Sequence, residues 1–422
     1  MSVSTSSAPV HAYERISGRG WLLVAVCLIG ISAGPAAFGI ASLGLFIEVF
    51  EKQFGWSRTE VSSAASVMMI CTAISMPFVG RLVDRIGPRR VLIPSIVLLG
   101  LCMLAIPFLV TQFWQFMLIY VLMGTIAAGT NSVPYMRVLA SWFDRSRGLA
   151  IGIAGSGTGL GFAYVPLVGH AAISQFGWQA GYVVLGLIMF CIVLPLVFFF
   201  LKETPDGGQV EDNSAAKKDL AGMSLSEAMR QRNFWLLAAI FITLAFVLYG
   251  LIPHLTPMLT DRGLTAAAAA GIASLFGFAT FGGRVFIGFL IDKFDARLVA
   301  VTFFSISALG LLLLAVPLPD WAIVVAAVLL GGSLGAEVDM LAYMTSRYFG
   351  LKCFAEIFGV IFGAVLVAMG LGPMAFGLVF DKTGSYQAIL LIGAPACLLA
   401  AALMFLLPPI AQARRGAAIS VT

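Results

Sequence analysis

Long apolar stretches separated by short polar segments recur along almost the whole chain. Most of them reach about 20 residues, the length that an α-helix needs to cross a hydrocarbon core of ~30 Å. The pattern predicts twelve transmembrane helices, at residues 21–46, 61–79, 91–110, 114–140, 148–172, 181–201, 234–255, 266–290, 298–316, 321–345, 354–379 and 388–407. We therefore expect an all-α polytopic membrane protein.

Composition and charge placement agree with this pattern. Of the 422 residues, 60% are hydrophobic and 11% are charged, whereas about 25% of the residues of a soluble domain are charged. Nineteen of the 25 basic residues fall on the side of the predicted helices that carries both termini. Because basic loops stay in the cytoplasm, we expect a multi-pass protein of the inner or plasma membrane with both termini cytoplasmic. No basic cluster is interleaved with aromatic residues in a soluble segment, so we expect the lipid bilayer and no nucleic acid as a partner.

One polar and charged segment, residues 202–232, interrupts the apolar pattern near the middle of the chain. We interpret it as a cytoplasmic linker between two units of six helices each. The N-terminal unit with a short tail would comprise residues 1–201, and the C-terminal unit with its tail residues 233–422.

The two predicted units repeat each other locally. The loop after the second helix reads GRLVDRIGPRR from Gly80, and the loop after the eighth reads GFLIDKFDAR from Gly288. A shift of 208 residues superimposes these glycines, places Asp84 on Asp292 and places Arg89 on Arg297. The repeat predicts two pseudo-symmetric six-helix bundles.

The GRLVDRIGPRR loop resembles the signature of the major facilitator superfamily. The resemblance implies that fold and a cytoplasmic latch that stabilises the outward-facing state. The glycine would let the second and eleventh helices approach, and the charged side chains would form charge-assisted hydrogen bonds. The alternative is that the arginines only set topology. We expect this cytoplasmic gate to comprise Gly80, Arg81, Asp84, Arg85, Arg147, Asp292 and Glu356.

The start of the fifth predicted helix narrows this resemblance to one family within the superfamily. Residues 142–157 read WFDRSRGLAIGIAGSG, which is similar to the monocarboxylate transporter family in its aromatic pair, arginine and glycine-serine run. The resemblance covers nearly the whole chain and implies transport of a small carboxylate. Read from the residues alone, the glycines give this helix a small-residue face for packing against another helix.

Arg284 is the candidate for binding the substrate. It precedes Asp292 by eight residues, which places it ~12 Å into a ~30 Å core. A charge there costs at least ~2.5–3.5 kcal/mol, so we expect it to face a cavity and to hold an anion. In the monocarboxylate transporters, an arginine four residues before the second loop glycine binds the substrate carboxylate, as Arg284 precedes Gly288. The alternative is a structural ion pair within the C-terminal half.

Two departures put the coupling mechanism of that family in doubt. Its eukaryotic members pair the arginine with an aspartate one turn earlier, where this chain has Thr280. They also place a lysine in the first helix, where this chain has Gly39, Ile40 and their neighbours. Their arrangement for proton coupling is therefore not carried over.

The predicted helix 321–345 offers substitutes. Glu337 and Asp339 precede Arg347 by ten and eight residues, so both lie level with Arg284, and they point ~200° apart, so one of them faces the cavity. Asp339 shares its face with Tyr343. We expect one carboxylate to pair with Arg284 in the empty site and to protonate or yield when an anion arrives. On this hypothesis Asp339→Asn uncouples transport from pH, unless Glu337 is the residue that faces the cavity.

Uncharged candidates for substrate binding occur in two other predicted helices. Asn131 and Tyr135, four residues apart, would share one face of the helix 114–140 and meet the rest of a small acid. His254 follows a helix-breaking proline near the outer end of the helix 234–255. It could sense external pH or play a structural part.

These residues predict a secondary carrier for a small organic carboxylate, most simply a monocarboxylate, that is coupled to protons and functions as a monomer. An anion exchanger or uniporter is the first alternative, and a drug/proton antiporter of the same fold is the next. A membrane-embedded enzyme finds little support, since the three histidines lie far apart and neither an HExxH nor a GxSxG motif stands out. We expect no cofactor, no catalytic residue and no metal site.

Overall fold

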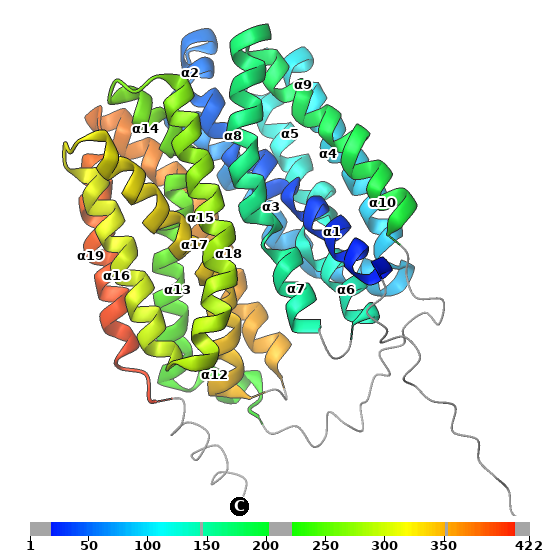
Figure 1. The fold of residues 1–422 in the computed structure, drawn as a ribbon, viewed down its shortest axis with the longest axis vertical. Coiled ribbons are helices and arrows are strands. Elements are labelled where there is room, and N and C mark those ends of the chain that lie inside the picture. The colour runs from blue at the N-terminus through cyan, green and yellow to red at the C-terminus, as the bar shows by residue number, and fades with distance from the viewer. Residues whose placement is uncertain (1–17, 144–146, 202–221, 351–352, 410–422) are drawn as a thin grey trace, which may run out of the picture.

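The computed structural model describes residues 18–143, 147–201, 222–350 and 353–409 (Figure 1). In these residues nearly the whole chain is helical, and the only β-type pairing is an isolated bridge between Gly222 and Gly350. The expectation of an all-α membrane protein is confirmed for this part of the chain.

The N-terminal half consists of helices in the following order. They are α1 (Gly18–Ser32), the π-helix η1 (Ala36–Ala41), α2 (Leu43–Phe54), α3 (Arg58–Ile86), α4 (Pro88–Leu109), α5 (Phe113–Thr125), the 3-10 helix η2 (Ala127–Thr130), α6 (Ser132–Trp142), α7 (Arg147–Gly155), α8 (Gly157–Phe176), α9 (Trp178–Ile188), the π-helix η3 (Met189–Val193) and α10 (Leu194–Phe200).

The C-terminal half follows the same plan. A short helix α12 (Leu225–Met229) precedes α13 (Arg232–Leu251), the 3-10 helix η4 (Ile252–His254), α14 (Leu255–Asp261), α15 (Ala266–Lys293), α16 (Ala296–Ala315), α17 (Asp320–Phe349), α18 (Phe354–Thr383) and α19 (Gln387–Met404). Ser224 and Glu227 begin α12 with a reciprocal capping box, which explains why this polar stretch folds.

Eleven continuous helical stretches in the described residues are long and apolar enough to cross a membrane. The fourth predicted span differs, because it consists of the short helices α5 and α6 joined by η2. Pro134 lies near the start of α6 and lacks the amide hydrogen that a continuous helix would need there. The break also lets the Ser95 hydroxyl donate to the carbonyl of Ile126 at 3.0 Å.

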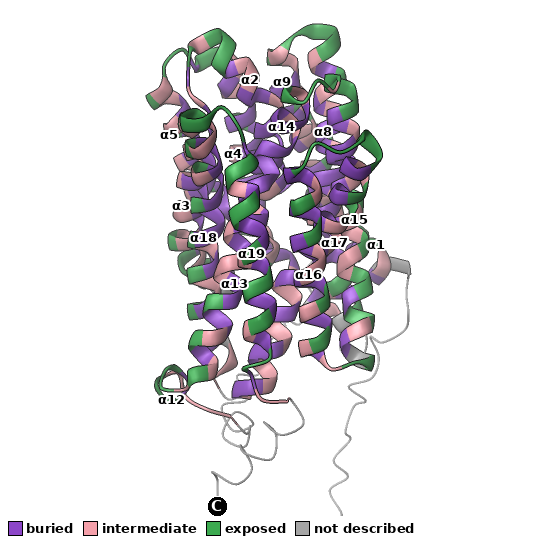
Figure 2. Cartoon of the chain, turned by 90° about the vertical axis from the view of Figure 1, so that its left-hand side faces the viewer, coloured by how far each residue is buried: buried purple, intermediate pink, exposed green. Residues whose placement is uncertain are grey.

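Two groups of helices face each other in Figure 1, and the contact between them runs along α3 with α18 and α8 with α15. We call the face on which α1 begins and α19 ends the termini face. The opposite face, where α2 ends and α3 begins, is the distal face. Buried residues concentrate along the helices between the two faces, and exposed residues lie mainly at the ends and on the outer surface (Figure 2).

The repeated loop motif has matching contacts in the two halves. Arg89 donates from Nη2 to the carbonyl oxygen of Phe198 at 2.6 Å, and Arg297 donates from Nη1 to that of Leu407 at 2.9 Å. Phe198 belongs to α10, and Leu407 lies three residues beyond Met404, the last residue of α19. Each arginine of the repeat therefore bonds to the chain within or just after the final helix of its own half.

Glycines show where the two halves touch along α3 and α18. A Cβ added at Gly377 would lie 2.8 Å from the carbonyl oxygen of Arg58, and one at Gly370 would lie 3.1 Å from that of Ser66. A Cβ at Gly80, at the other end of α3, would meet nothing within 4 Å. In this structure α3 and α18 therefore approach each other closely near the distal face and lie apart at Gly80, and the contact expected at Gly80 in the outward-facing state stays a prediction.

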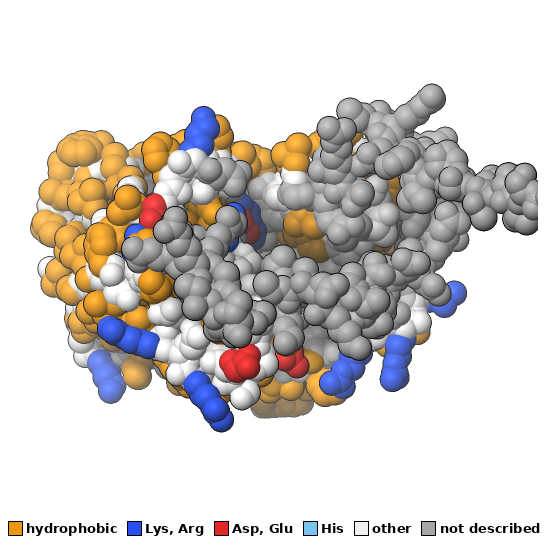
Figure 3. All heavy atoms as spheres, turned by 90° about the horizontal axis from the view of Figure 1, so that it is seen from below, with side chains coloured by type: hydrophobic (Ala, Val, Ile, Leu, Met, Phe, Trp, Pro, Cys, Tyr) orange, Lys and Arg blue, Asp and Glu red, His pale blue; other side chains and the backbone are white. Residues whose placement is uncertain are grey.

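The pair formed by α8 and α15 separates in the same direction. Gly159 packs directly against the backbone of Phe281, and Gly277 against the backbone of Ala163. Gly152, nearer the termini face, has nothing within 4 Å of an added Cβ. The two halves thus touch near the distal face and diverge toward the termini face, where Figure 3 shows a hollow with basic and acidic side chains inside it.

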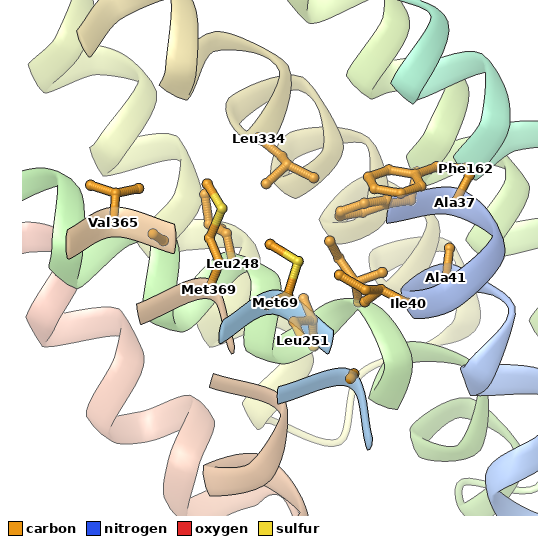
Figure 4. Packing of buried hydrophobic residues seen from close by; sticks show 14 of the residues in the cluster. Ala37, Ile40, Ala41, Met69, Phe162, Leu248, Leu251, Leu334, Val365 and Met369 are labelled. Atoms are coloured by element: carbon orange, nitrogen blue, oxygen red, sulfur yellow. The ribbon is translucent and has the colours of Figure 1, made fainter. Parts of the chain in front are cut away.

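An apolar layer from both halves fills the contact at depth (Figure 4). Ile40 of η1 and Met69 of α3 lie near Leu251 of α13 and Met369 of α18, and all four side chains are buried. Burial of such side chains stabilises the contact by about 1.5–3 kcal/mol each. This layer and the contacts beyond it close the molecule on its distal face.

Candidate functional site

Arg284 and Asp339 form a two-pronged ion pair inside the hollow. Nε of Arg284 donates to Oδ2 of Asp339 at 2.8 Å, and Nη2 donates to Oδ1 at 3.1 Å. Arg284 precedes Lys293, the last residue of α15, by nine residues, which places it ~14 Å from the end of the helix. Two parallel hydrogen bonds of this kind fix the orientation of the carboxylate as well as its position.

Small residues bring α15 and α17 close enough for this pair. The Cα of Gly335 in α17 lies against the backbone of Thr280, and an added Cβ would lie 2.8 Å from the amide nitrogen of Arg284. Gly283 lies against the backbone of Gly332 in the same way. A larger side chain at either glycine would push the two helices apart and lengthen the ion pair.

Arg284 also bonds across the contact between the two halves. Its Nη1 donates to the carbonyl oxygen of Gly155, the last residue of α7, at 2.6 Å. The side chain of Met136 in α6 lies beside the same glycine. The guanidinium of the C-terminal half therefore contacts both halves.

The pair remains accessible to solvent. The side chain of Arg284 keeps 19% of its exposure and that of Asp339 keeps 41%. Neither side chain of the pair is therefore sealed from solvent. Among the described residues, no group of three or more His, Cys, Asp or Glu side chains is placed to hold a metal ion.

Glu337 points away from this pair, as the helical angle between the two acidic residues requires. It is only 2% exposed, and neither carboxylate oxygen has a hydrogen-bond partner among the residues that the structure describes. Of the two α17 carboxylates, Asp339 therefore faces the hollow and contacts Arg284.

Tyr343 and Arg347 extend the site toward the termini face. Tyr343 lies one turn beyond Asp339, and the guanidinium carbon of Arg347 lies 4.8 Å from the centre of its ring. Both side chains are half-buried. Asp339, Tyr343 and Arg347 thus form one polar face of α17 that leads outward from Arg284.

The structure separates Asn131 from Tyr135. Asn131 is the extended residue before α6, and its Nδ2 donates to the carbonyl oxygen of Ala128 at 3.1 Å. Tyr135 is fully buried against α1, where an added Cβ at Gly30 would lie 2.5 Å from its ring. The two side chains do not share a continuous helix face, because Asn131 is extended and α6 begins only at Ser132.

Arg58 binds across the distal face, although the sequence indicated only a loop charge. It donates to both carboxylate oxygens of Asp261 at 2.6 and 2.9 Å and to the hydroxyl oxygen of Tyr386 at 2.9 Å. Its guanidinium carbon lies 3.7 Å from the centre of the Phe380 ring, and its backbone amide donates to Asp381 at 3.2 Å. One side chain of the N-terminal half is thus held by three segments of the C-terminal half.

His254 lies beneath this cluster and is fully buried. Nδ1 is 2.9 Å from the hydroxyl oxygen of Tyr386, and Nε2 is 2.8 Å from the carbonyl oxygen of Pro373. Burial raises the pKa of Tyr386, which keeps its hydroxyl proton available for Nδ1. Nε2 of a neutral imidazole then carries the hydrogen and donates to Pro373. The structure thus places His254 in the closed distal contact, with both nitrogens bonded.

The predicted gate residues lie apart at the open termini face. Arg81, Arg85 and Glu356 are exposed, and no ion pair links them to another described residue. The guanidinium carbon of Arg81 lies 5.7 Å from the centre of the Phe78 ring. The side chains of the remaining charged gate residues, Asp84, Arg147 and Asp292, lie outside the described structure.

Three contact residues escaped the sequence reasoning. Gly155 counted only as a packing residue, yet its carbonyl accepts from Arg284. Tyr249 of α13 lies within electrostatic range of Arg284, Asp339 and Glu337. No local pattern marks such contacts, although the position of Arg58 directly before an apolar helix was a signal that could have been followed.

Comparisons with known proteins fit this architecture. The family model described as Major Facilitator Superfamily matches residues 29–286 and again residues 249–420. The uncharacterized MFS-type transporter YcxA of Bacillus subtilis is 27% identical over 83% of this chain and 86% of its own length. Monocarboxylate transporter 2 of Homo sapiens is 24% identical over 90% of this chain and 84% of its own length.

A solved structure shares the fold. The bacterial homolog of the human lysosomal transporter Spinster, in an inward-facing and unoccupied conformation, superimposes with a TM-score of 0.69 at 19% identity and covers 96% of this chain and 99% of its own. The family model matches both halves of the chain. This match agrees with the two groups of membrane-spanning helices, the repeated loop motif and the charged site between the groups. The chain belongs to the major facilitator superfamily of membrane transporters.

Proposed function

We propose that this chain is a secondary transporter of a small organic carboxylate, with a monocarboxylate as its preferred substrate, and that it works by alternating access and is coupled to protons. Arg284 binds the substrate, and the two halves rock around it. The likeness to monocarboxylate transporter 2 supports this substrate class.

One observation carries the proposal: the fork of Arg284 already holds a carboxylate, that of Asp339, in two parallel hydrogen bonds at a solvated site between the halves. A substrate carboxylate has the same shape and charge, so it can replace Asp339 on the same two donors. A guanidinium offers five N–H donors, and three of them are used here. The others are available for an arriving anion before Asp339 leaves.

The contact from Arg284 to Gly155 connects binding with movement. A substrate that draws the guanidinium toward itself alters a hydrogen bond between the two halves. A carrier of this kind switches between its inward-open and outward-open states both with and without substrate. A ligand that replaces Asp339 on Arg284 and keeps the bond to Gly155 can shift the equilibrium between these two states. One cation at this depth favours a substrate with one carboxylate.

We place the termini face in the cytoplasm, on the strength of the basic residues that gather there. The structure is then the inward-open state, with the distal face closed toward the outside. Proton coupling fits the two buried or half-buried carboxylates of α17, whereas exchange or uniport without protons is the alternative that the experiment below distinguishes.

A ligand screen tests the proposal. Purified protein in detergent is heated with L-lactate, pyruvate, benzoate, malate, a neutral sugar or a cationic dye at two pH values, and unfolding is followed. We expect the monocarboxylates to raise the melting temperature most, and Arg284→Gln to remove that shift. Equal shifts by the sugar or the dye would contradict the proposed anion specificity.

Transport is then measured in liposomes. Accumulation of a stabilising carboxylate under an inward proton gradient indicates symport, while uptake that requires carboxylate on both sides indicates exchange. Arg262→Gln is the matched control, because Arg262 bonds within the C-terminal half, to the carbonyl of Leu314. It should transport like the wild type.

A further inference from the structure

Glu337 is the one carboxylate of the described core that lacks any support for a charge. It lies in the interior of α17, twelve residues before Phe349 and seventeen after Asp320, so it sits deep in the membrane span. Its side chain is 2% exposed, and neither oxygen has a partner among the described residues. An ionised carboxylate in such a place is very costly, whereas the neutral acid is tolerated.

The groups that face Glu337 come from two neighbouring helices. Tyr249 of α13 and Cys397 of α19 are within electrostatic range of it. The other helices packed around α17 bring no further charge to this depth: α16 has only Arg297 at its start, and α15 has Arg284, which is engaged by Asp339. In α18 the charged residues lie near its two ends.

Asp339 is already engaged by a cation in this state. Its two oxygens accept hydrogen bonds from Arg284, and its side chain is 41% exposed to solvent. The two α17 carboxylates therefore differ: Asp339 is paired with a cation, as a counter-ion is, whereas Glu337 is buried without a partner among the described residues.

We propose that Glu337 binds the proton that is transported with the carboxylate. This inference rests on the proposed function and names its coupling residue. Asp339 serves as the counter-ion that holds Arg284 while the anion is absent. This assignment of the proton to Glu337 replaces the sequence-based expectation that Asp339→Asn uncouples transport from pH.

The proposal gives an order of events. With Glu337 neutral, Arg284 can exchange Asp339 for a substrate anion; with Glu337 ionised, a second negative charge near the site opposes that anion. Proton binding therefore precedes anion binding, and on the other side the anion leaves first. In the release step the O–H bond of Glu337 breaks, its proton passes to water in the hollow, and a carboxylate remains. The structure corresponds to the stage after anion release and before proton release.

The test uses the full chain in liposomes with radiolabelled L-lactate. Glu337→Gln mimics the protonated acid, so we expect exchange of L-lactate for L-lactate to remain within about two-fold of the wild type, while accumulation driven by a proton gradient falls by at least about ten-fold. Asp339→Asn should still accumulate L-lactate when the gradient is applied, but more slowly than the wild type, because release of the substrate is slower. Accumulation by Glu337→Gln at the wild-type level, or loss of exchange as severe as in Arg284→Gln, would overturn the proposal.

Infrared difference spectroscopy gives a readout that does not depend on transport. Purified wild-type protein at neutral pH should show the C=O stretching band of a protonated carboxyl group, and the band should be absent from Glu337→Gln and present in Asp339→Asn. If L-lactate is not a substrate but the band behaves in this way, the proposed substrate fails while the proton site stands. Cys397→Ala, which alters packing beside Glu337 without removing the acid, should keep the band; a band unchanged in Glu337→Gln contradicts the assignment.

Discussion

Arg58 and Asp261 form a bidentate ion pair, with distances of 2.6 and 2.9 Å, that joins the first residue of α3 to the last residue of α14. The pair links the two halves at the distal face, opposite the hollow that contains Arg284. Its position indicates that the closed distal face depends on a specific polar cluster in addition to apolar packing. Removing it should change the balance between the two conformations of the carrier.

The first prediction concerns this pair. Asp261→Asn removes the charged partner of Arg58 in the other half and leaves only Glu51 of its own half, 3.3 Å from Nε. Hydrogen bonds to charged groups contribute roughly 1.5–3 kcal/mol. We expect the distal face to open more often, so that a cysteine introduced at Ser66 reacts faster with a water-soluble maleimide. Arg262→Gln, which alters the neighbouring arginine that bonds within one half, is the control. An unchanged reaction rate in Asp261→Asn would show that apolar packing alone closes this face.

The second prediction separates charge from shape at Arg284. Lysine keeps the positive charge but lacks the planar fork, so Arg284→Lys should bind carboxylates about 10- to 100-fold more weakly than the wild type. It should still prefer anions over neutral ligands. Isothermal titration with the best carboxylate of the screen measures the change, and equal affinity in the two proteins would rule out two-pronged recognition.

The third prediction concerns the competition between Asp339 and the substrate. The neutral amide of an asparagine is a weaker acceptor than a carboxylate, so Asp339→Asn should leave Arg284 more available and tighten carboxylate binding by about ten-fold. Release should become slower in proportion, which lowers turnover in liposomes. Weaker binding in Asp339→Asn would show instead that Asp339 positions Arg284 for the anion.

The fourth prediction uses the glycines of α3 and α18. A side chain at Gly80 meets nothing in this structure, but the termini face must close around it in the opposite state. Gly80→Leu should therefore retain carboxylate binding and melting temperature while transport is lost. Gly377→Leu should instead lower the melting temperature, since its Cβ would press on the backbone of Arg58 and Thr59 in the closed distal contact. Equal transport by Gly80→Leu and the wild type would place the gate elsewhere.

The fifth prediction is a pH dependence outside the membrane spans. Hydrogen bonds from Arg297 lower the pKa of Asp295 below its usual value of 3.8. Its stabilising effect is therefore present above that value and is lost as the pH falls through the lower value of the folded state. Asp295→Asn should destabilise the protein at neutral pH by less than about 1 kcal/mol, because the pair is partly exposed. Melting curves of the two proteins should converge at the acidic end of a pH series.

The order of the helices could be derived from the sequence because a bilayer imposes a length on every apolar segment. The same reasoning placed Arg284, Glu337 and Asp339 at similar depths, since residues along a helix rise by a fixed step. It also found the repeat of Gly80 and Gly288, and the family comparison confirmed the resemblance behind the fold. These conclusions need no knowledge of which helices touch.

Other features depend on contacts between distant segments, which no local pattern contains. The angle between residues two positions apart on a helix established that Glu337 and Asp339 point apart. Only the packing of α15 on α17 decided that Asp339 contacts Arg284. The break before Asn131 depends on Ser95 of another helix as well as on the local proline. The place of His254 depends on Tyr386, which follows it by 132 residues.

The sequence by itself therefore determined the number, depth and order of the membrane helices and the kind of charge between them, because hydrophobic length and the cost of a buried charge are local properties. The tertiary structure alone decided which carboxylate is paired, which is left without a partner, and which face of the molecule is open. Those outcomes follow from how two bundles of helices pack against each other, and one change of that packing, with the sequence unchanged, is what alternating access requires.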